Sequence, residues 1–224
     1  MGLREKLDAL RQRLRPALDP EDRAAVDWAV ERLGMLQIVE HGLAAGDTLP
    51  DFALRDSAGR AVTSDDLLAR GPLVVNFFRG TWCPYCSLAL QAFDEALPAI
   101  DDLGAGFVAI SPLKPEELAR AAEERGLRLA MLSDPADAYA KVCGVHYEMS
   151  PGQVALYRKR GLDLDALNAG AGWEVPVPAT YVVGRDGVIA YAFADPDWSR
   201  RAEPADVLAA LRRLVQAADA ASAA

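Results

Sequence analysis

Residues 73–88, LVVNFFRGTWCPYCSL, decide the fold and carry the most reactive side chains of the chain. The largely apolar run 73–78 is typical of a buried strand. A short turn, Arg79-Gly80-Thr81, follows it, and Pro84 suits the first position of a helix, where its missing N–H costs no hydrogen bond. The stretch therefore predicts a strand, a turn and a helix, with Cys83 and Cys86 at the start of the helix.

The composition of the chain argues against a membrane-spanning, a secreted or a nucleic-acid-binding protein. The chain has 224 residues, of which 51% are hydrophobic and 25% charged, as in a soluble globular protein. No apolar run approaches the roughly 20 residues that span a bilayer, and the N-terminus lacks the apolar segment of a secretory signal. A net charge of −9 argues against nucleic acids and anionic membranes as partners. Three cysteines are too few for a disulfide framework, so we expect a cytoplasmic protein with neither a membrane nor a nucleic-acid partner.

Two amphipathic helices are predicted before the first strand. Leu3, Leu7, Leu10 and Leu14 form one apolar stripe, and Pro16 ends that helix. Asp19-Pro20 then starts a second helix, with Asp19 as its N-cap. Three roles remain open for this extension, residues 1–45: packing on the main domain, a homodimer contact, or the binding of a partner.

The remainder alternates strands and helices. Short strands are expected at 52–54 and 61–63, central strands at 107–111 and 129–132, and a hairpin at 180–193 around Arg185-Asp186-Gly187, with helices between them. We read 145–173 as an irregular or partly helical insertion over the core, and Asp195-Pro196-Asp197-Trp198 as a turn. The fold class is α/β, a central mixed sheet flanked by helices, with one domain at 46–216 and a frayed tail at 217–224.

The two cysteines are suited to redox chemistry. A nucleophilic cysteine must be a thiolate, and the unpaired N–H groups of a helix N-terminus favour that anion. Cys83 takes this position, so we expect Cys83 to attack and Cys86, one turn further in, to resolve the resulting sulfenic acid or mixed disulfide. Arg79, four residues earlier, is either a source of further positive charge or a surface arginine.

Other readings of the pair are weaker. A zinc site needs further ligands, and the two histidines, His41 and His146, do not have ligand spacing. Two further alternatives are that both cysteines are incidental core residues, or that a dimer bridges an iron–sulfur cluster through Cys83. Cys143 is expected to be a buried small hydrophobe, with a second resolving thiol as the alternative. We therefore expect neither a metal nor an organic cofactor.

The motifs FFRGTWCPYC and VPVPATYVVGRDGVIAYAF, with the opening GDTLPDFALRDSAGRAVTSDDL, resemble the thioredoxin-like superfamily and, within it, the peroxiredoxin-like (alkyl hydroperoxide reductase/thiol-specific antioxidant) branch. The resemblance covers about residues 46–215. It implies a thioredoxin-like fold and thiol-based reduction of peroxides or disulfides, with a thioredoxin-type or other dithiol as reductant.

Individual residues match the motifs of this family to different degrees. Cys83 corresponds to the attacking cysteine, and Thr81 resembles the peroxide-holding threonine, although it stands two residues before the cysteine instead of three. The arginine that usually precedes the strand at 181–183 is missing, and Arg79 is a candidate to replace it. Pro178 instead resembles the cis-proline beside the C-x-x-C pair of dithiol oxidoreductases, and Trp82 resembles their packing lid.

We therefore predict a thiol peroxidase that uses Cys83 and Cys86. One alternative is a thioredoxin-like disulfide reductase without peroxidase activity, favoured by the Cys-Pro-Tyr-Cys pair, by Pro178 and by the missing arginine. The other is a redox-sensing module whose N-terminal helices bind a partner.

Overall fold

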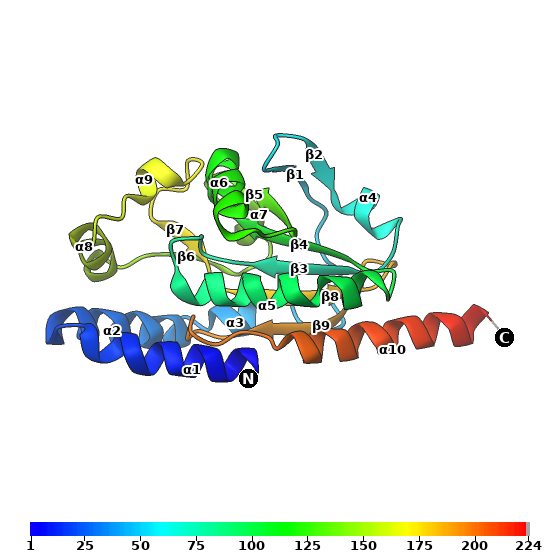
Figure 1. Ribbon diagram of the computed structural model, residues 1–224, viewed down its shortest axis with the longest axis horizontal. Helices are drawn as coiled ribbons and strands as arrows, with labels where there is room; N and C mark the ends of the chain where they lie inside the picture. Colours follow the sequence, from blue (N-terminus) through cyan, green and yellow to red (C-terminus); the bar gives the residue numbers. More distant parts are fainter. Residues whose placement is uncertain (223–224) are drawn as a thin grey trace.

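The computed structural model describes residues 1–222, which form a mixed seven-stranded sheet with helices on both faces (Figure 1). The strand order is β2-β1-β5-β4-β3-β8-β9, with β3, β4 and β5 parallel and the outer pairs antiparallel. The strands are β1 (Ala53–Asp56), β2 (Ala61–Thr63), β3 (Leu73–Phe77), β4 (Gly106–Ser111), β5 (Ala130–Ser133), β8 (Ala179–Val183) and β9 (Ile189–Ala194). The α/β prediction with a mixed sheet is confirmed.

The central strand β3 is buried on both faces because it pairs with β4 on one side and β8 on the other. Successive side chains of a strand point to opposite faces. Leu73, Val75 and Phe77 accordingly lie in one core cluster, and Val74 lies in the other, which also holds Cys83 and Cys86. The sheet therefore places the cysteine turn at the end of its most protected strand.

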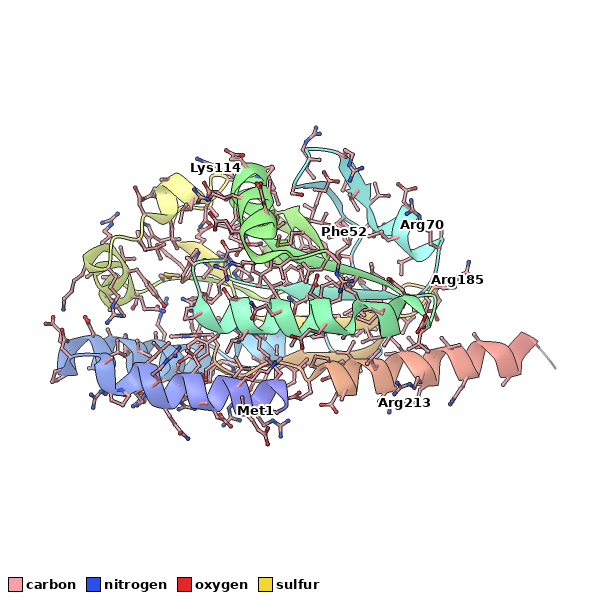
Figure 2. All side chains as sticks on the ribbon, viewed as in Figure 1. Met1, Phe52, Arg70, Lys114, Arg185 and Arg213 are labelled. Carbon is pink, nitrogen blue, oxygen red and sulfur yellow. The ribbon has the colours of Figure 1, made fainter. Side chains whose placement is uncertain are left out.

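The helices divide between the two faces. The core that holds the cysteines is covered by α5 (Pro84–Asp101), α6 (Pro115–Arg125) and α10 (Pro204–Ser222), and the opposite core by α4 (Ser64–Leu68) and α7 (Ala138–Val142). Phe52 packs edge to face on Tyr139 on that opposite side, whereas Arg70 and Arg213 point into solvent (Figure 2). No helix within residues 1–222 is long and apolar enough to cross a membrane.

The N-terminal extension packs on its own chain. It consists of α1 (Leu3–Leu14), a 3-10 turn η1 (Arg15–Ala17), α2 (Pro20–Met35) and the short α3 (Ile38–His41). Leu3 and Leu7 of α1 pack on Ala89 of α5, and α2 lies against α8 (Pro151–Lys159). Asp19 caps α2 by accepting a hydrogen bond from the Asp22 backbone N–H (2.9 Å), as predicted. The extension thus covers the side of the molecule that carries the cysteine turn.

Several local predictions need correction. The segment 145–173 is partly helical, as expected, with α8 and α9 (Leu164–Leu167), but it also contains a strand that was not predicted: β6 (His146–Glu148), which pairs with β7 (Glu174–Pro176). The helix expected after Asp134 is divided into η2 (Pro135–Asp137) and α7, because Ala136 and Asp137 have positive φ. The last helix continues to Ser222, beyond the expected start of fraying, and residues 223–224 of the predicted tail lie outside the described part of the chain.

Candidate active site

Cys83 is the N-cap residue of α5, and Pro84 occupies the first helical position, as predicted. The turn before it is tight. Gly80 has a φ of 149°, and a Cβ at this position would lie 2.2 Å from Nε1 of Trp82. A glycine is therefore required for the Trp82 ring to fold back over the turn. The side chain of Cys83 is left only 2% exposed.

Cys86 lies one helical turn beyond Cys83 and is completely buried. Its Sγ accepts a hydrogen bond from Nη2 of Arg201 at 3.3 Å. Arg201 is itself only 6% exposed, and its Nη1 donates to the carbonyls of Trp198 and Arg200. A guanidinium held by two backbone carbonyls therefore presents its charge to the second sulfur of the pair.

The pKa values of the two thiols are shifted in opposite directions. The hydrogen bond with Cys86, together with burial, raises the pKa of Cys83 well above its ordinary value. Burial opposes ionisation of Cys86 too, but the hydrogen bond from Cys83 and the charges of Arg201 and Arg79 outweigh it and hold the pKa of Cys86 well below the usual range. The negative charge of the reduced pair therefore rests on Cys86, whereas the sequence pointed to Cys83.

Arg79 is fully buried, so the alternative of a surface arginine is excluded. Its guanidinium carbon lies 4.9 Å from the ring centroid of Trp82, 5.7 Å from that of Tyr157 and 4.6 Å from that of Trp198. Nη2 donates to the Tyr157 hydroxyl at 3.1 Å, whereas Nε and Nη1 have no hydrogen-bond partner within residues 1–222. Three aromatic rings stabilise the charge by cation–π contact, and two nitrogens of the guanidinium remain buried without a hydrogen-bond partner.

A cavity of about 600 Å³ opens over this cluster. Arg79, Trp82 and Cys83 line it, whereas its lining does not include Cys86, Thr81 or Pro178. The two cysteines are therefore unequal in access: a ligand in the cavity meets Cys83, and Cys86 lies behind it.

The other two predicted site residues have different surroundings. The carbonyl of Thr81 accepts hydrogen bonds from Arg125 Nη2 (2.8 Å) and Ser87 Oγ (3.3 Å), which fixes the turn. Pro178 is buried between β7 and β8, but every peptide bond in residues 1–222 is trans, so the cis-proline prediction is wrong. Val177 bonds to the Val145 carbonyl (2.6 Å) and Ala179 pairs directly with Phe77, so the chain stays extended through Pro178.

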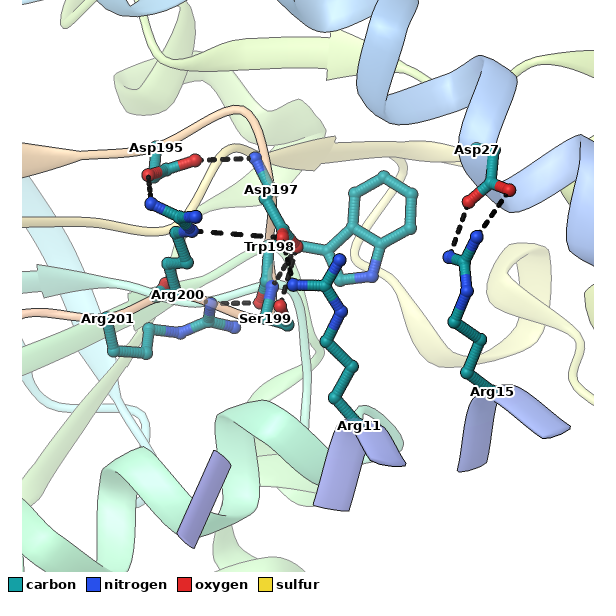
Figure 3. A network of polar contacts seen from close by, with 9 residues as sticks. All are labelled: Arg11, Arg15, Asp27, Asp195, Asp197, Trp198, Ser199, Arg200 and Arg201. Atoms are coloured by element: carbon teal, nitrogen blue, oxygen red, sulfur yellow. Dashed lines mark hydrogen bonds and ion pairs between the residues drawn. The ribbon is translucent and has the colours of Figure 1, made fainter. Parts of the chain in front are cut away.

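The segment Asp195–Arg201 contacts Arg11 of the N-terminal extension (Figure 3). At its other end, Arg201 contacts Cys86. The start of the segment is the predicted turn, since Asp195 Oδ1 accepts a hydrogen bond from the Asp197 backbone at 2.8 Å. Arg11 of α1 pairs with Asp197 (3.2 Å), and the segment continues through Trp198 to Arg201. The segment therefore supplies one aromatic face to Arg79 and one hydrogen bond to Cys86.

Sequence reasoning missed Arg201 and Tyr157, because their roles depend on contacts between residues 115 and 78 positions apart. Only the unusual Asp-Pro-Asp-Trp sequence drew attention to the neighbourhood of Arg201, and nothing local singled out Tyr157. Cys143, by contrast, is 1% exposed in the core cluster on the opposite face of the sheet from Cys83 and Cys86, as expected of a small core residue. It cannot resolve Cys83 without leaving that core.

These features define a thioredoxin-like domain with two cysteines one turn apart at the N-terminus of a helix. Residues 45–192 match the family model of the AhpC/TSA family, and the chain belongs to that family. Membership makes it a thiol-dependent oxidoreductase of the peroxidase type, with a peroxide as oxidant and a dithiol as reductant, as the sequence predicted.

Individual relatives agree with this assignment. A Mycobacterium tuberculosis protein assigned to the peroxiredoxins is 29% identical over 150 residues, which cover 67% of this chain and 84% of that protein. Peroxiredoxin Bcp of Escherichia coli is 32% identical over 108 residues, which cover 48% and 69%. The crystal structure of peroxidoxin BcpB from M. tuberculosis shares the fold, with a TM-score of 0.60 and 23% identity over 77% of this chain and 98% of that one.

Proposed function

We propose that Cys83 reduces a peroxide and that Cys86 resolves the product as an intramolecular disulfide. One observation carries this division of roles: Cys83 lines the cavity, and Cys86 does not. The free Nε and Nη1 of Arg79, in the same cavity, are the donors suited to the peroxide oxygens. Arg79 thus replaces the arginine that usually precedes the strand at 181–183 in this family and that is missing from this sequence.

The chemistry can be written in balanced steps. Cys83 passes its thiol proton to the Cys86 thiolate, and its sulfur attacks the terminal oxygen of the hydroperoxide. The O–O bond breaks, the sulfur is oxidised to sulfenic acid, and the alkoxide leaves as the alcohol after taking the proton from Cys86. The regenerated Cys86 thiolate then attacks Sγ of Cys83, the S–O bond breaks, and hydroxide leaves as water after taking a proton from solvent.

An external dithiol restores the reduced pair. Its first thiolate attacks Sγ of Cys83, which faces the cavity, the Cys83–Cys86 bond breaks, and Cys86 leaves as a thiolate. The hydrogen bond from Arg201 stabilises that leaving group. The second thiolate of the donor then attacks the donor sulfur of this mixed disulfide, so that Cys83 leaves as a thiolate and takes a proton from solvent, and the donor becomes a disulfide. We place this cycle in the cytoplasm, where dithiol donors are maintained in the reduced state. We assign it to residues 46–216, with no role for a metal, an organic cofactor, a membrane or a nucleic acid.

Stopped-flow oxidation of the reduced protein tests the proposal. We expect hydrogen peroxide or an organic hydroperoxide to oxidise Cys83 much faster than a free thiol, and Cys83→Ser to abolish that reaction. A wild-type rate no higher than that of a free thiol with every peroxide would contradict the peroxidase assignment. The Cys143→Ser variant is the matched control, because it removes a cysteine on the other face of the sheet.

A disulfide reductase is the second candidate, because a dithiol begins a helix here and thiol-disulfide oxidoreductase ResA of Geobacillus thermodenitrificans is 31% identical over 104 residues, which cover 46% of this chain and 59% of that protein. Rapid reduction of insulin by a protein that reacts with peroxides only at the rate of a free thiol would favour this candidate. The trans bond before Pro178 removes one of the three sequence arguments for this candidate.

A further inference from the structure

The cavity over Cys83 has a wall that the family domain does not supply. Residues 45–192 match the family, yet side chains of α1, η1 and α2 line the same cavity as Cys83 and Arg79. Five aliphatic side chains of this segment line it, namely Leu14, Ala17, Leu18, Val26 and Val30, and Leu18 lies between η1 and α2. The extension therefore forms part of the site itself.

This wall faces further apolar surface. Val26 and Val30 lie one turn apart on α2 and so share one face of the helix. The other sides of the cavity are formed by the aromatic rings and leucines of the main domain, namely Trp82, Tyr85, Leu156, Tyr157, Leu162 and Trp198. An apolar molecule that enters the cavity would thus be covered from both sides.

Most charges around the cavity are paired; Glu31, at an exposed position of α2, lines the cavity without an ion-pair partner within residues 1–222. Arg15 makes a bidentate contact with Asp27 (2.6 and 2.7 Å), which joins η1 to α2, and Arg11 pairs with Asp197 at 3.2 Å (Figure 3). Arg79 differs, since it has no carboxylate partner within residues 1–222 and two of its nitrogens are free. The buried end of the cavity is therefore polar and reactive, and the remaining walls are largely apolar.

The size of the cavity exceeds what hydrogen peroxide needs. A water molecule occupies about 30 Å³ in the liquid, and a molecule with two oxygens needs roughly twice as much. About 600 Å³ is instead typical of sites that enclose an organic molecule, for which the usual range is roughly 300–1,000 Å³. Both volume and polarity fit an amphipathic substrate with its reactive group at the inner end.

We propose that the N-terminal helices bind the apolar body of a bulky organic hydroperoxide, with Leu14, Leu18, Val26 and Val30 as specificity-determining residues, while its hydroperoxide group meets Cys83 and Arg79. The extension thereby selects large hydroperoxides over hydrogen peroxide. This rests on the proposed peroxidase function, and the redox balance is that of the same cycle: hydroperoxide and dithiol give alcohol, water and disulfide.

The test compares two oxidants in stopped flow, hydrogen peroxide and cumene hydroperoxide, with Val30→Trp and Ala24→Trp. Val30→Trp fills the cavity, whereas Ala24→Trp adds the same ring at an exposed position of the same helix. We expect Val30→Trp to lower the rate constant for cumene hydroperoxide by about tenfold or more, because the apolar body loses its place, and to leave that for hydrogen peroxide within about twofold. Ala24→Trp should change neither.

Val30→Ala is a second variant in case Val30→Trp does not fold, since it removes only two methyl groups from the cavity wall. It should lower the rate with cumene hydroperoxide a few-fold and leave hydrogen peroxide unaffected. Three results would each contradict the proposal that this wall binds organic hydroperoxides. They are equal effects on both oxidants, no effect on either oxidant, and a loss confined to insulin reduction. If wild-type protein reacts with both oxidants only as a free thiol does, the peroxidase function itself fails, and that result is distinct from the others.

Discussion

Arg201 donates a hydrogen bond from Nη2 to Sγ of Cys86 over 3.3 Å, and both side chains are buried. Hydrogen bonds to charged groups contribute about 1.5–3 kcal/mol, and this one lowers the pKa of the Cys86 thiol. The contact therefore stabilises the reduced, ionised pair relative to the disulfide.

Arg201→Met should raise the pKa of Cys86, because the hydrogen bond and the charge of the guanidinium are lost. It should also make the Cys83–Cys86 disulfide a weaker oxidant, because the reduced form is less stabilised. Ultraviolet absorbance of the thiolate against pH, and equilibration with glutathione, measure the two effects. Arg200→Met is the matched control, since the Arg200 side chain is 65% exposed and pairs with Asp195 and Asp197. An unchanged thiolate titration in Arg201→Met would show that the contact does not govern the charge on Cys86.

Cys86→Ser should leave the first oxidation of Cys83 in place and stop the cycle at the sulfenic acid. Mass spectrometry after one equivalent of peroxide, with a nucleophilic trap for sulfenic acid, should find the adduct on Cys83. The first step itself should slow, because the Cys86 thiolate that accepts the Cys83 proton is lost. Adducts on Cys143 would contradict the assigned roles.

Arg79→Lys should lower the rate constant for peroxide by about 100-fold, since the fixed Nε and Nη1 donors are lost, and loss of one such donor typically costs 10²–10³. The ammonium keeps the charge among the three aromatic rings, so the variant should fold. Arg158→Lys is the control, because Arg158 also stacks on a tryptophan, Trp173 at 5.1 Å, but at a separate exposed position. Equal rates in wild type and Arg79→Lys would remove Arg79 from the site.

Asp137 predicts a pH dependence of folding stability. Burial raises its pKa to about 6, while the hydrogen bond from His146 Nδ1 (2.9 Å) opposes that shift. The folded state therefore holds the proton more tightly than the unfolded state, whose pKa is near 3.8, so this group's contribution to stability is full below about pH 4 and falls as pH rises towards 6. A shift of roughly two units amounts to about 3 kcal/mol.

Asp137→Asn should flatten this slope, as urea unfolding at several pH values between 4 and 7 would show. Exposed Asp101→Asn serves as its control and should retain the wild-type slope. Were the slope unchanged in Asp137→Asn, a different group would be responsible for it.

Cys143 should be inert. Burial raises the pKa of its thiol to about 12, so it remains protonated at neutral pH. Alkylation with iodoacetamide should label Cys143 only after unfolding, and Cys143→Ser should leave peroxide turnover unchanged. Labelling of Cys143 in the native protein would show that the core around α7 opens.

Local sequence determined much of this molecule. The sequence of residues 73–88 is sufficient to predict β3, the turn and α5: the apolar run predicts the strand, the glycine the turn, and the proline the start of the helix. These signals are local because strand burial, backbone sterics and helix N-terminal geometry act over a few neighbouring residues. The same holds for the leucine stripe of α1 and the Asp19 cap of α2. The pairing of Cys83 with Cys86 followed from their spacing alone.

Tertiary structure decided the electrostatics and the cavity. Whether Arg79 is buried depends on Tyr157 and Trp198, and the charge on Cys86 depends on Arg201; all three lie far along the chain. The wall over Cys83 depends likewise on how α1 and α2 pack on α5 and α8. The sequence by itself determined which atoms react, because reactivity resides in the side chain. Only the folded chain decided which sulfur is charged and which is accessible, since charge interactions and burial act through space between residues that the sequence keeps apart.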